Sequence, residues 1–100
     1  MTKSELPGTI VVGGKELIRT PHRNPSFTAW GCPGLSVIYS MESDYRSLFW
    51  HVSVARTPQR PTPEMLSDAV HAIIGIGASY EIEKTANPNV LHAFEPEAHV

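Results

Sequence analysis

The pattern of hydrophobic and polar positions is clearest on either side of the polar segment 42–47. In residues 35–41 every second side chain is large and apolar. In residues 48–55 the apolar side chains of Trp50, Val52 and Val54 recur with the same period of two. Side chains of a β-strand alternate between its two faces, so both segments are predicted to be strands with one buried face. The polar tip between them predicts an antiparallel hairpin.

A helical period replaces this alternation after the proline-rich break at residues 57–61. Thr62 precedes Pro63 and an acidic residue, which is typical of a helix start because a threonine side chain caps free backbone N–H groups and proline suits the first helical position. Apolar residues at helical spacing follow: Leu66, Ala69, Val70, Ile73 and Ile74. The sequence therefore predicts an amphipathic helix over about residues 63–75, ended by a glycine.

Near the N-terminus, two β-prone runs, residues 9–12 and 15–19, flank Gly13 and Gly14. Both glycines can adopt the positive φ angles that a tight two-residue turn requires. This pattern predicts a small N-terminal hairpin.

Two further β-prone segments follow the expected helix. Residues 79–84 alternate, with Tyr80 and Ile82 expected on the inner face, and residues 90–94 are expected to form a last short strand. Together these elements predict an α+β fold, in which an antiparallel sheet carries one helix on one face and begins with the N-terminal hairpin.

The chain length and composition indicate a single globular domain. The chain has 100 residues, of which 41% are hydrophobic and 18% are charged, and this is enough for one modest core. We expect the domain to span residues 9–95, preceded by a flexible N-terminal arm at residues 1–8 and followed by a polar tail at residues 96–100.

The charge balance argues against several classes of partner. Eight Lys and Arg residues oppose ten Asp and Glu residues, which gives a net charge of −2, and there is no basic tract, so nucleic-acid binding is not expected. No segment approaches the roughly 20 apolar residues that a membrane span needs. The single cysteine, Cys32, has no intramolecular disulfide partner and fits a reducing cytoplasm.

The histidines are the most prominent candidates for chemistry. The chain has five: His22, His51, His71, His92 and His99. His51 and His92 lie on separate predicted strands and could be neighbours, but no cysteine pair or HExxH spacing supports a zinc site. We therefore interpret His51 and His92 as half-buried sheet residues and expect neither a metal nor another cofactor.

A catalytic interpretation starts from the sequence His51-Val52-Ser53. It matches the H-x-[ST] unit that two-histidine phosphoesterases carry twice and in which the paired imidazoles act as general acid and base on a phosphodiester. The second unit would begin at His92, where Phe94 replaces the hydroxyl residue. A small histidine-dependent phosphodiester-processing enzyme is therefore kept as an alternative.

The second face of the predicted sheet carries Ile38 and Phe49, opposite the face that carries Trp50. Two arrangements are possible for these apolar side chains. Residues 9–30 cover them, which is the arrangement that we favour, or they form an apolar surface for a partner.

Three motifs in order, over about residues 34–95, resemble a family of small uncharacterised domains found in bacteriophages and actinobacterial prophages. These motifs are a W-H-x-S-V strand at residues 50–54, a P-T-x-E helix start at residues 61–64 and an N-x-x-H-x-F strand at residues 89–94. The resemblance implies a phage context. It brings no established activity, so it assigns no catalytic residue.

The chain departs from the family pattern at two positions of the helix start. Pro63 replaces the usual aromatic residue, and Met65 stands where the family has a second acidic residue. Residues 1–33 match the family only loosely. The resemblance therefore concerns the central hairpin, the helix and the last strand.

These observations lead us to expect a non-enzymatic phage accessory protein that acts by protein–protein contact in the host cytoplasm, binding or inhibiting a host protein. The expected surfaces are the sheet face opposite Trp50 and the tip of the central hairpin, since Tyr and Arg are enriched at binding hot spots. The candidate binding residues are Tyr45, Arg46, Phe49, His51, Ser53 and His92. A homodimer formed through an exposed edge strand and a virion or nucleic-acid component are kept as alternatives.

Overall fold

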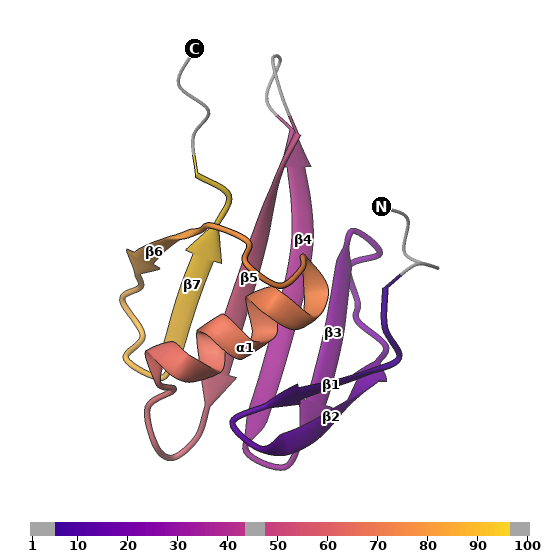
Figure 1. Ribbon diagram of the computed structural model, residues 1–100. Coiled ribbons are helices and arrows are strands. Elements are labelled where there is room, and N and C mark those ends of the chain that lie inside the picture. Colours follow the sequence, from indigo (N-terminus) through magenta and orange to yellow (C-terminus); the bar gives the residue numbers. More distant parts are fainter. Residues whose placement is uncertain (1–5, 44–47, 97–100) are drawn as a thin grey trace.

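Seven antiparallel strands and one helix make up the chain in a computed structural model that describes residues 6–43 and 48–96 (Figure 1). The strands are β1 (Thr9–Val12), β2 (Lys15–Thr20), β3 (Phe27–Cys32), β4 (Leu35–Ser43), β5 (Leu48–Arg56), β6 (Glu81–Lys84) and β7 (Val90–Phe94), and the helix is α1 (Pro63–Ile73). They form a single sheet in the order β1-β2-β3-β4-β5-β7-β6. The predicted α+β class is confirmed.

The central hairpin is longer than its alternating pattern indicated. Strands β4 and β5 pair from Leu35 opposite Arg56 to Ser43 opposite Leu48, so Glu42 belongs to a strand rather than to the polar tip. Residues 44–47 lie outside the described residues. The strand extension matters because it fixes the face of the sheet on which Glu42 lies.

Helix α1 begins where the sequence predicts. The hydroxyl of Thr62 accepts a hydrogen bond from the backbone N–H of Met65 at 3.2 Å, and Pro63 occupies the first helical position. The buried side chains of the helix are Met65, Leu66, Ala69, Val70 and Ile73. The helix has 11 residues, and the described part of the chain contains no helix long and apolar enough to cross a membrane.

The core fills the space between α1 and one face of the sheet. Val37 on β4 and Val52 and Val54 on β5 are fully buried there, as is Leu66 on the helix. These strand residues have the parity that the alternating pattern assigned to the inner face. The apolar contacts between the two layers supply most of the stabilisation of the fold.

The N-terminal hairpin packs on the helix side of the sheet. Gly13 and Gly14, with φ angles of 59° and 77°, form its predicted turn. Val12 is fully buried, β1 packs against α1, and the N–H of Gly13 donates to Asp68 Oδ2 at 2.9 Å. The expectation that residues 9–30 cover the second sheet face is therefore wrong, because the apolar side of β1 packs against the helix instead (Figure 1).

The expected N-terminal arm is packed where the structure describes it. Leu6 is buried in the core, and the carbonyl of Pro7 accepts a hydrogen bond from Trp30 Nε1 at 2.9 Å. The carbonyl of Gly8 accepts another from the N–H of Arg19 at 2.8 Å. Residues 1–5, and 97–100 of the expected C-terminal tail, lie outside the described residues.

Strand β6 differs from its prediction. It begins at Glu81 rather than at residue 79, and Ile82, which pairs with buried Ala93 on the helix side of the sheet, is 48% exposed instead of buried. Tyr80 precedes the strand and is half-buried against the core. The physical reason is position: β6 is the outer strand of the sheet, past β7, while α1 packs against β1, β5 and β7.

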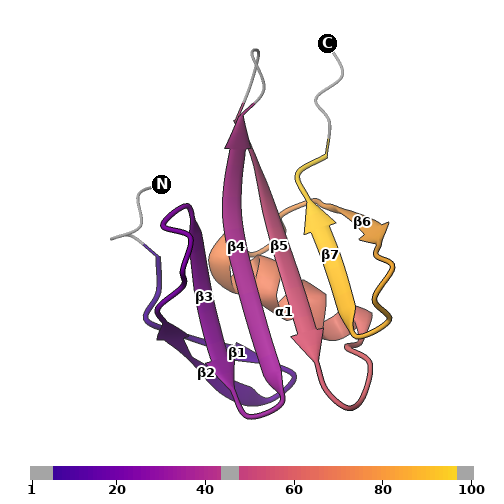
Figure 2. The ribbon, with the colours of Figure 1, turned by 180° about the vertical axis from the view of Figure 1, so that it is seen from behind.

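The other face of the sheet carries no second layer in the described part of the chain. Seen from behind, strands β3, β4, β5 and β7 lie in front of the helix with nothing drawn across them (Figure 2). We call this surface the open face. Its side chains are those of opposite parity to the buried valines, among them His51 and Ser53.

Candidate functional site

Strand register brings the candidate residues of the open face together. One row across four strands runs Ile38, Ser53, His92, Glu83 on β4, β5, β7 and β6. The adjacent row runs Phe27, Ser40, His51, Phe94 on β3, β4, β5 and β7. Residues two apart on a strand point to the same side, so both rows project from the open face.

The two histidines and the serine form a continuous chain of hydrogen bonds. Ser53 Oγ lies 2.7 Å from His92 Nδ1, and His92 Nε2 lies 2.8 Å from His51 Nδ1. Both distances lie within the usual range of protein hydrogen bonds. Each neutral imidazole has one N–H and one acceptor nitrogen, so the chain can run from the Ser53 hydroxyl through His92 to His51 with a consistent set of donors.

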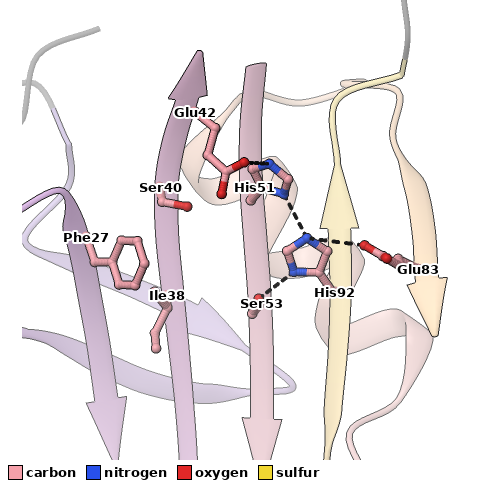
Figure 3. A pocket seen from close by; sticks show the side chains of 8 residues that line it. All are labelled: Phe27, Ile38, Ser40, Glu42, His51, Ser53, Glu83 and His92. Atoms are coloured by element: carbon pink, nitrogen blue, oxygen red, sulfur yellow. Dashed lines mark hydrogen bonds and ion pairs between the residues drawn. The ribbon is translucent and has the colours of Figure 1, made fainter. Parts of the chain in front are cut away.

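A carboxylate stands at each end of this imidazole pair. Glu42 Oε2 is 3.4 Å from His51 Nε2, and Glu83 Oε2 is 4.0 Å from His92 Nε2 (Figure 3). The contact between Glu42 and His51 has the distance of an ion pair but not the alignment of a hydrogen bond. His51 Nε2 is therefore buried without a hydrogen-bond partner among the described residues. A small rotation of Glu42, whose side chain is mostly exposed, would provide one.

Electrostatics favour the neutral form of His92. Burial lowers the pKa of this imidazole, and the neighbouring His51 lowers it further, while Glu83 and Glu42 act in the opposite direction. The cause is that a charged ring loses hydration and would repel a second charged ring at hydrogen-bond distance. His92 is therefore mainly neutral at pH 7, and both of its ring nitrogens are engaged, one with Ser53 and the other with His51.

The pair lies in a shallow hollow of about 390 Å³. The hollow is lined by Phe27, Ile38, Ser40, Glu42, His51, Ser53, Glu83 and His92 (Figure 3). Aromatic rings adjoin it: the ring centroid of Phe49 is 5.3 Å from that of His51, and that of Phe94 is 6.4 Å from that of His92. The open face thus combines a polar centre with apolar surroundings.

Four of the six candidate residues from the sequence meet at this site. His51, Ser53 and His92 are in direct contact, and Phe49 packs beside them. The other two candidates, Tyr45 and Arg46, lie outside the described residues.

The remaining described histidines lie apart from the pair, His22 beside Phe27 and His71 on α1. Across residues 6–43 and 48–96, no group of three or more His, Cys, Asp or Glu side chains is arranged to hold a metal ion.

Sequence reasoning missed the two glutamates of the site. The alternating pattern places Glu42 in the polar tip, and it does not mark Glu83 as different from the other polar residues of segment 79–84. The alternation of β4, continued by one residue pair past Ser40, would have placed Glu42 on the open face. No local signal could have placed Glu83, because its position depends on β6 pairing with β7 and β7 pairing with β5.

The arrangement can perform proton transfer or bind a ligand through its polar groups. Two imidazoles in contact can exchange a proton, and the hydroxyl of Ser53 lies beside a base.

Comparisons of the chain with models of protein families, with curated proteins and with solved structures find no match.

Proposed function

We propose that this chain is a small accessory protein that binds another protein through the open face of its sheet. The observation that supports this proposal is the placement of the covering elements. Helix α1 and strand β1 both pack on the same side of the sheet, so the described part of the chain leaves the other side uncovered. A sheet face with half-buried aromatic side chains and no second layer is typical of a docking surface.

The side chains of the open face fit this role. Phe27, Phe49 and Phe94 are half-buried around the imidazole pair, not withdrawn into the core. Protein interfaces are enriched in aromatic residues that surround a few polar groups, and such groups fix the orientation of the partner. The open face has both features.

The biological setting is also a proposal. The resemblance of residues 34–95 to phage and prophage domains supports a phage-encoded protein whose partner is a host protein. A chain with one cysteine fits action in the reducing cytoplasm of the host cell.

The test is partner capture with two matched double variants. Phe49→Ala with Phe94→Ala removes apolar area from the open face, and Ile76→Ala with Ile82→Ala removes exposed apolar area that lies outside this face. We expect the first variant to lose the protein that the wild type captures from host lysate, and the second to keep it. Thermal melts followed by circular dichroism would confirm that both variants fold.

Equal capture of that protein by the wild type and the open-face variant would refute the proposal. If the captured protein is a second copy of this chain, size-exclusion chromatography of the wild type will show a dimer. The open-face variant would then elute as a monomer.

A second candidate function, acid–base catalysis on a phosphodiester, is favoured by the 2.8 Å contact between His51 and His92. Two facts count against it. The carboxylates of Glu42 and Glu83 adjoin the imidazoles and would repel a phosphate group, and the described lining residues include no Lys or Arg to offset them. Moreover, the two imidazoles bond to each other rather than leaving a gap for the scissile group.

Hydrolysis of bis(4-nitrophenyl) phosphate would decide between the two functions. We expect no turnover above the rate of a His92→Gln variant. Turnover by the wild type that His92→Gln abolishes would establish the enzyme instead.

A further inference from the structure

The hollow on the open face has an apolar side and an acidic rim. Phe27 and Ile38 form the apolar side, and the carboxylates of Glu42 and Glu83 stand at the two ends of the imidazole pair (Figure 3). The two glutamate side chains are 61% and 65% exposed. Their oxygen atoms are therefore open to a ligand that enters the hollow.

The hollow carries a negative charge when its imidazoles are neutral. Among the lining residues that the structure describes, Glu42 and Glu83 are then the only charged groups, and none is Lys or Arg. Two carboxylates beside a partly buried polar surface repel anions and attract cations. The chemistry of the hollow therefore selects a positively charged ligand.

Among the described residues, neither carboxylate has an aligned hydrogen-bond partner. Glu42 approaches His51 Nε2 without hydrogen-bond geometry, and Glu83 stays 4.0 Å from His92 Nε2. An ionised carboxylate can accept several hydrogen bonds. Both glutamates thus keep the capacity to accept charge-assisted bonds, which are stronger than bonds between neutral groups.

The side chains of arginine and lysine match this hollow because each has an aliphatic stem and a positively charged end. Their aliphatic stems pack on apolar surfaces such as Phe27 and Ile38, while their charged ends seek carboxylates. A small inorganic cation would leave the apolar side of the hollow unused.

We propose that the hollow receives the cationic end of an arginine or lysine side chain from the partner protein. The stem of that side chain lies against Phe27 and Ile38, and its charge lies between Glu42 and Glu83. This inference rests on the proposed function and names the chemistry of the residue at the centre of the interface.

The test is an NMR titration of the full chain with blocked tripeptides that carry Arg, Lys, Gln or Glu between two alanines. We expect the Arg or Lys peptide to shift the side-chain resonances of His51 and His92 and the Gln and Glu peptides to leave them in place. Added salt should weaken the response, because the attraction is between exposed charges.

Matched variants connect the titration to the two carboxylates. Glu42→Gln with Glu83→Gln keeps the shape of the hollow and removes its charge, so we expect at least a tenfold loss of affinity for the cationic peptide. Glu64→Gln removes an exposed acid in the first turn of α1 and should leave the affinity unchanged. Absence of any response to the Arg and Lys peptides, or an unchanged affinity in the Glu42 and Glu83 variant, would overturn the inference.

Titration with ZnCl₂ covers the other cationic occupant. Shifts of the histidine resonances with zinc but with neither cationic peptide would make the hollow a metal site and refute the inference. The partner-capture experiment distinguishes failure of the inference about the cationic side chain from failure of the proposed docking function. If the variant with both phenylalanines truncated loses the partner while the variant with both glutamates neutralised keeps it fully, the docking surface stands and the cationic side chain is refuted.

Discussion

The two faces of the sheet are built from the same strands but have opposite physical characters. On β5, Val52 and Val54 are fully buried under α1, while His51 and Ser53, one residue away, project from the open face (Figure 3). Burial of an aliphatic side chain contributes about 1.5–3 kcal/mol to folding, whereas a hydrogen bond contributes about 0.5–1.5 kcal/mol net. The covered face therefore contributes most of the stability.

The largest difference between the faces should appear when a side chain is truncated on each. Leu66 is fully buried on the covered side, so Leu66→Ala should lower the free energy of unfolding by about 2–5 kcal/mol, through lost burial and the cavity left behind. Phe49→Ala, on the open face, should cost clearly less, because Phe49 is only half-buried. Urea denaturation of both variants measures the comparison, and similar losses would show that the open face also belongs to the core.

A smaller effect should follow from disturbing the hairpin that packs on the covered side. Gly13→Ala should destabilise the fold by about 2–3 kcal/mol, because its φ of 59° is unfavourable for alanine and an added Cβ would lie 2.8 Å from Met65 Cε, forcing that buried side chain to shift. Gly14 has a φ of 77° but no atom within 4 Å of such a Cβ. Gly14→Ala should therefore lose only about 1–2 kcal/mol. If the two variants melt at the same temperature, the contact between position 13 and Met65 does not affect stability.

The cap of α1 should have a still smaller effect. Thr62→Ala removes the hydroxyl that accepts the N–H of Met65 and should lower the stability by about 0.5–2 kcal/mol. Thr62→Ser keeps the acceptor and should restore most of that loss. Chemical denaturation can resolve this difference, and equal stabilities for the two variants would mean that the cap contributes nothing.

The smallest effect should be the pH dependence that arises on the open face. The pKa of His92 is lowered in the folded state, so the unfolded chain binds more protons, and stability falls as the pH drops below the unfolded value of about 6.5. Above that pH His92 is mainly neutral in both the folded and the unfolded chain, so its titration no longer lowers the stability. His92→Gln should flatten the decrease, and His22→Gln, which leaves the pair intact, should keep it. An unchanged slope in His92→Gln would show that the loss comes from other groups.

Much of the fold follows from local patterns in the sequence. The alternation around the central hairpin, the cap and proline before α1, and the two glycines of the N-terminal hairpin each predict an element that the structure contains. These predictions succeed because turn geometry, capping and periodicity are decided by residues close in the chain. Long-range packing has no such local signal.

Apart from the exact bounds of β4 and β6, the failed expectations concern contacts between distant segments. Ile82 is exposed because β6 became the outer strand, and Leu6 is buried because the chain before β1 lies against Trp30. The N-terminal hairpin turned to the helix side, where Gly13 meets Asp68 across 55 positions of sequence. A pattern of apolar residues shows that a surface must be covered, but not which segment covers it.

The sequence by itself determined most of the elements, the buried faces of the central hairpin and of the helix, and the identity of the polar side chains opposite the core. The tertiary structure alone decided that His92 lies beside His51 and Ser53, that Glu42 and Glu83 flank them, and that this side of the sheet has no cover in the described residues. The reason is that local preferences set the conformation of each segment, whereas strand order and register set which side chains meet.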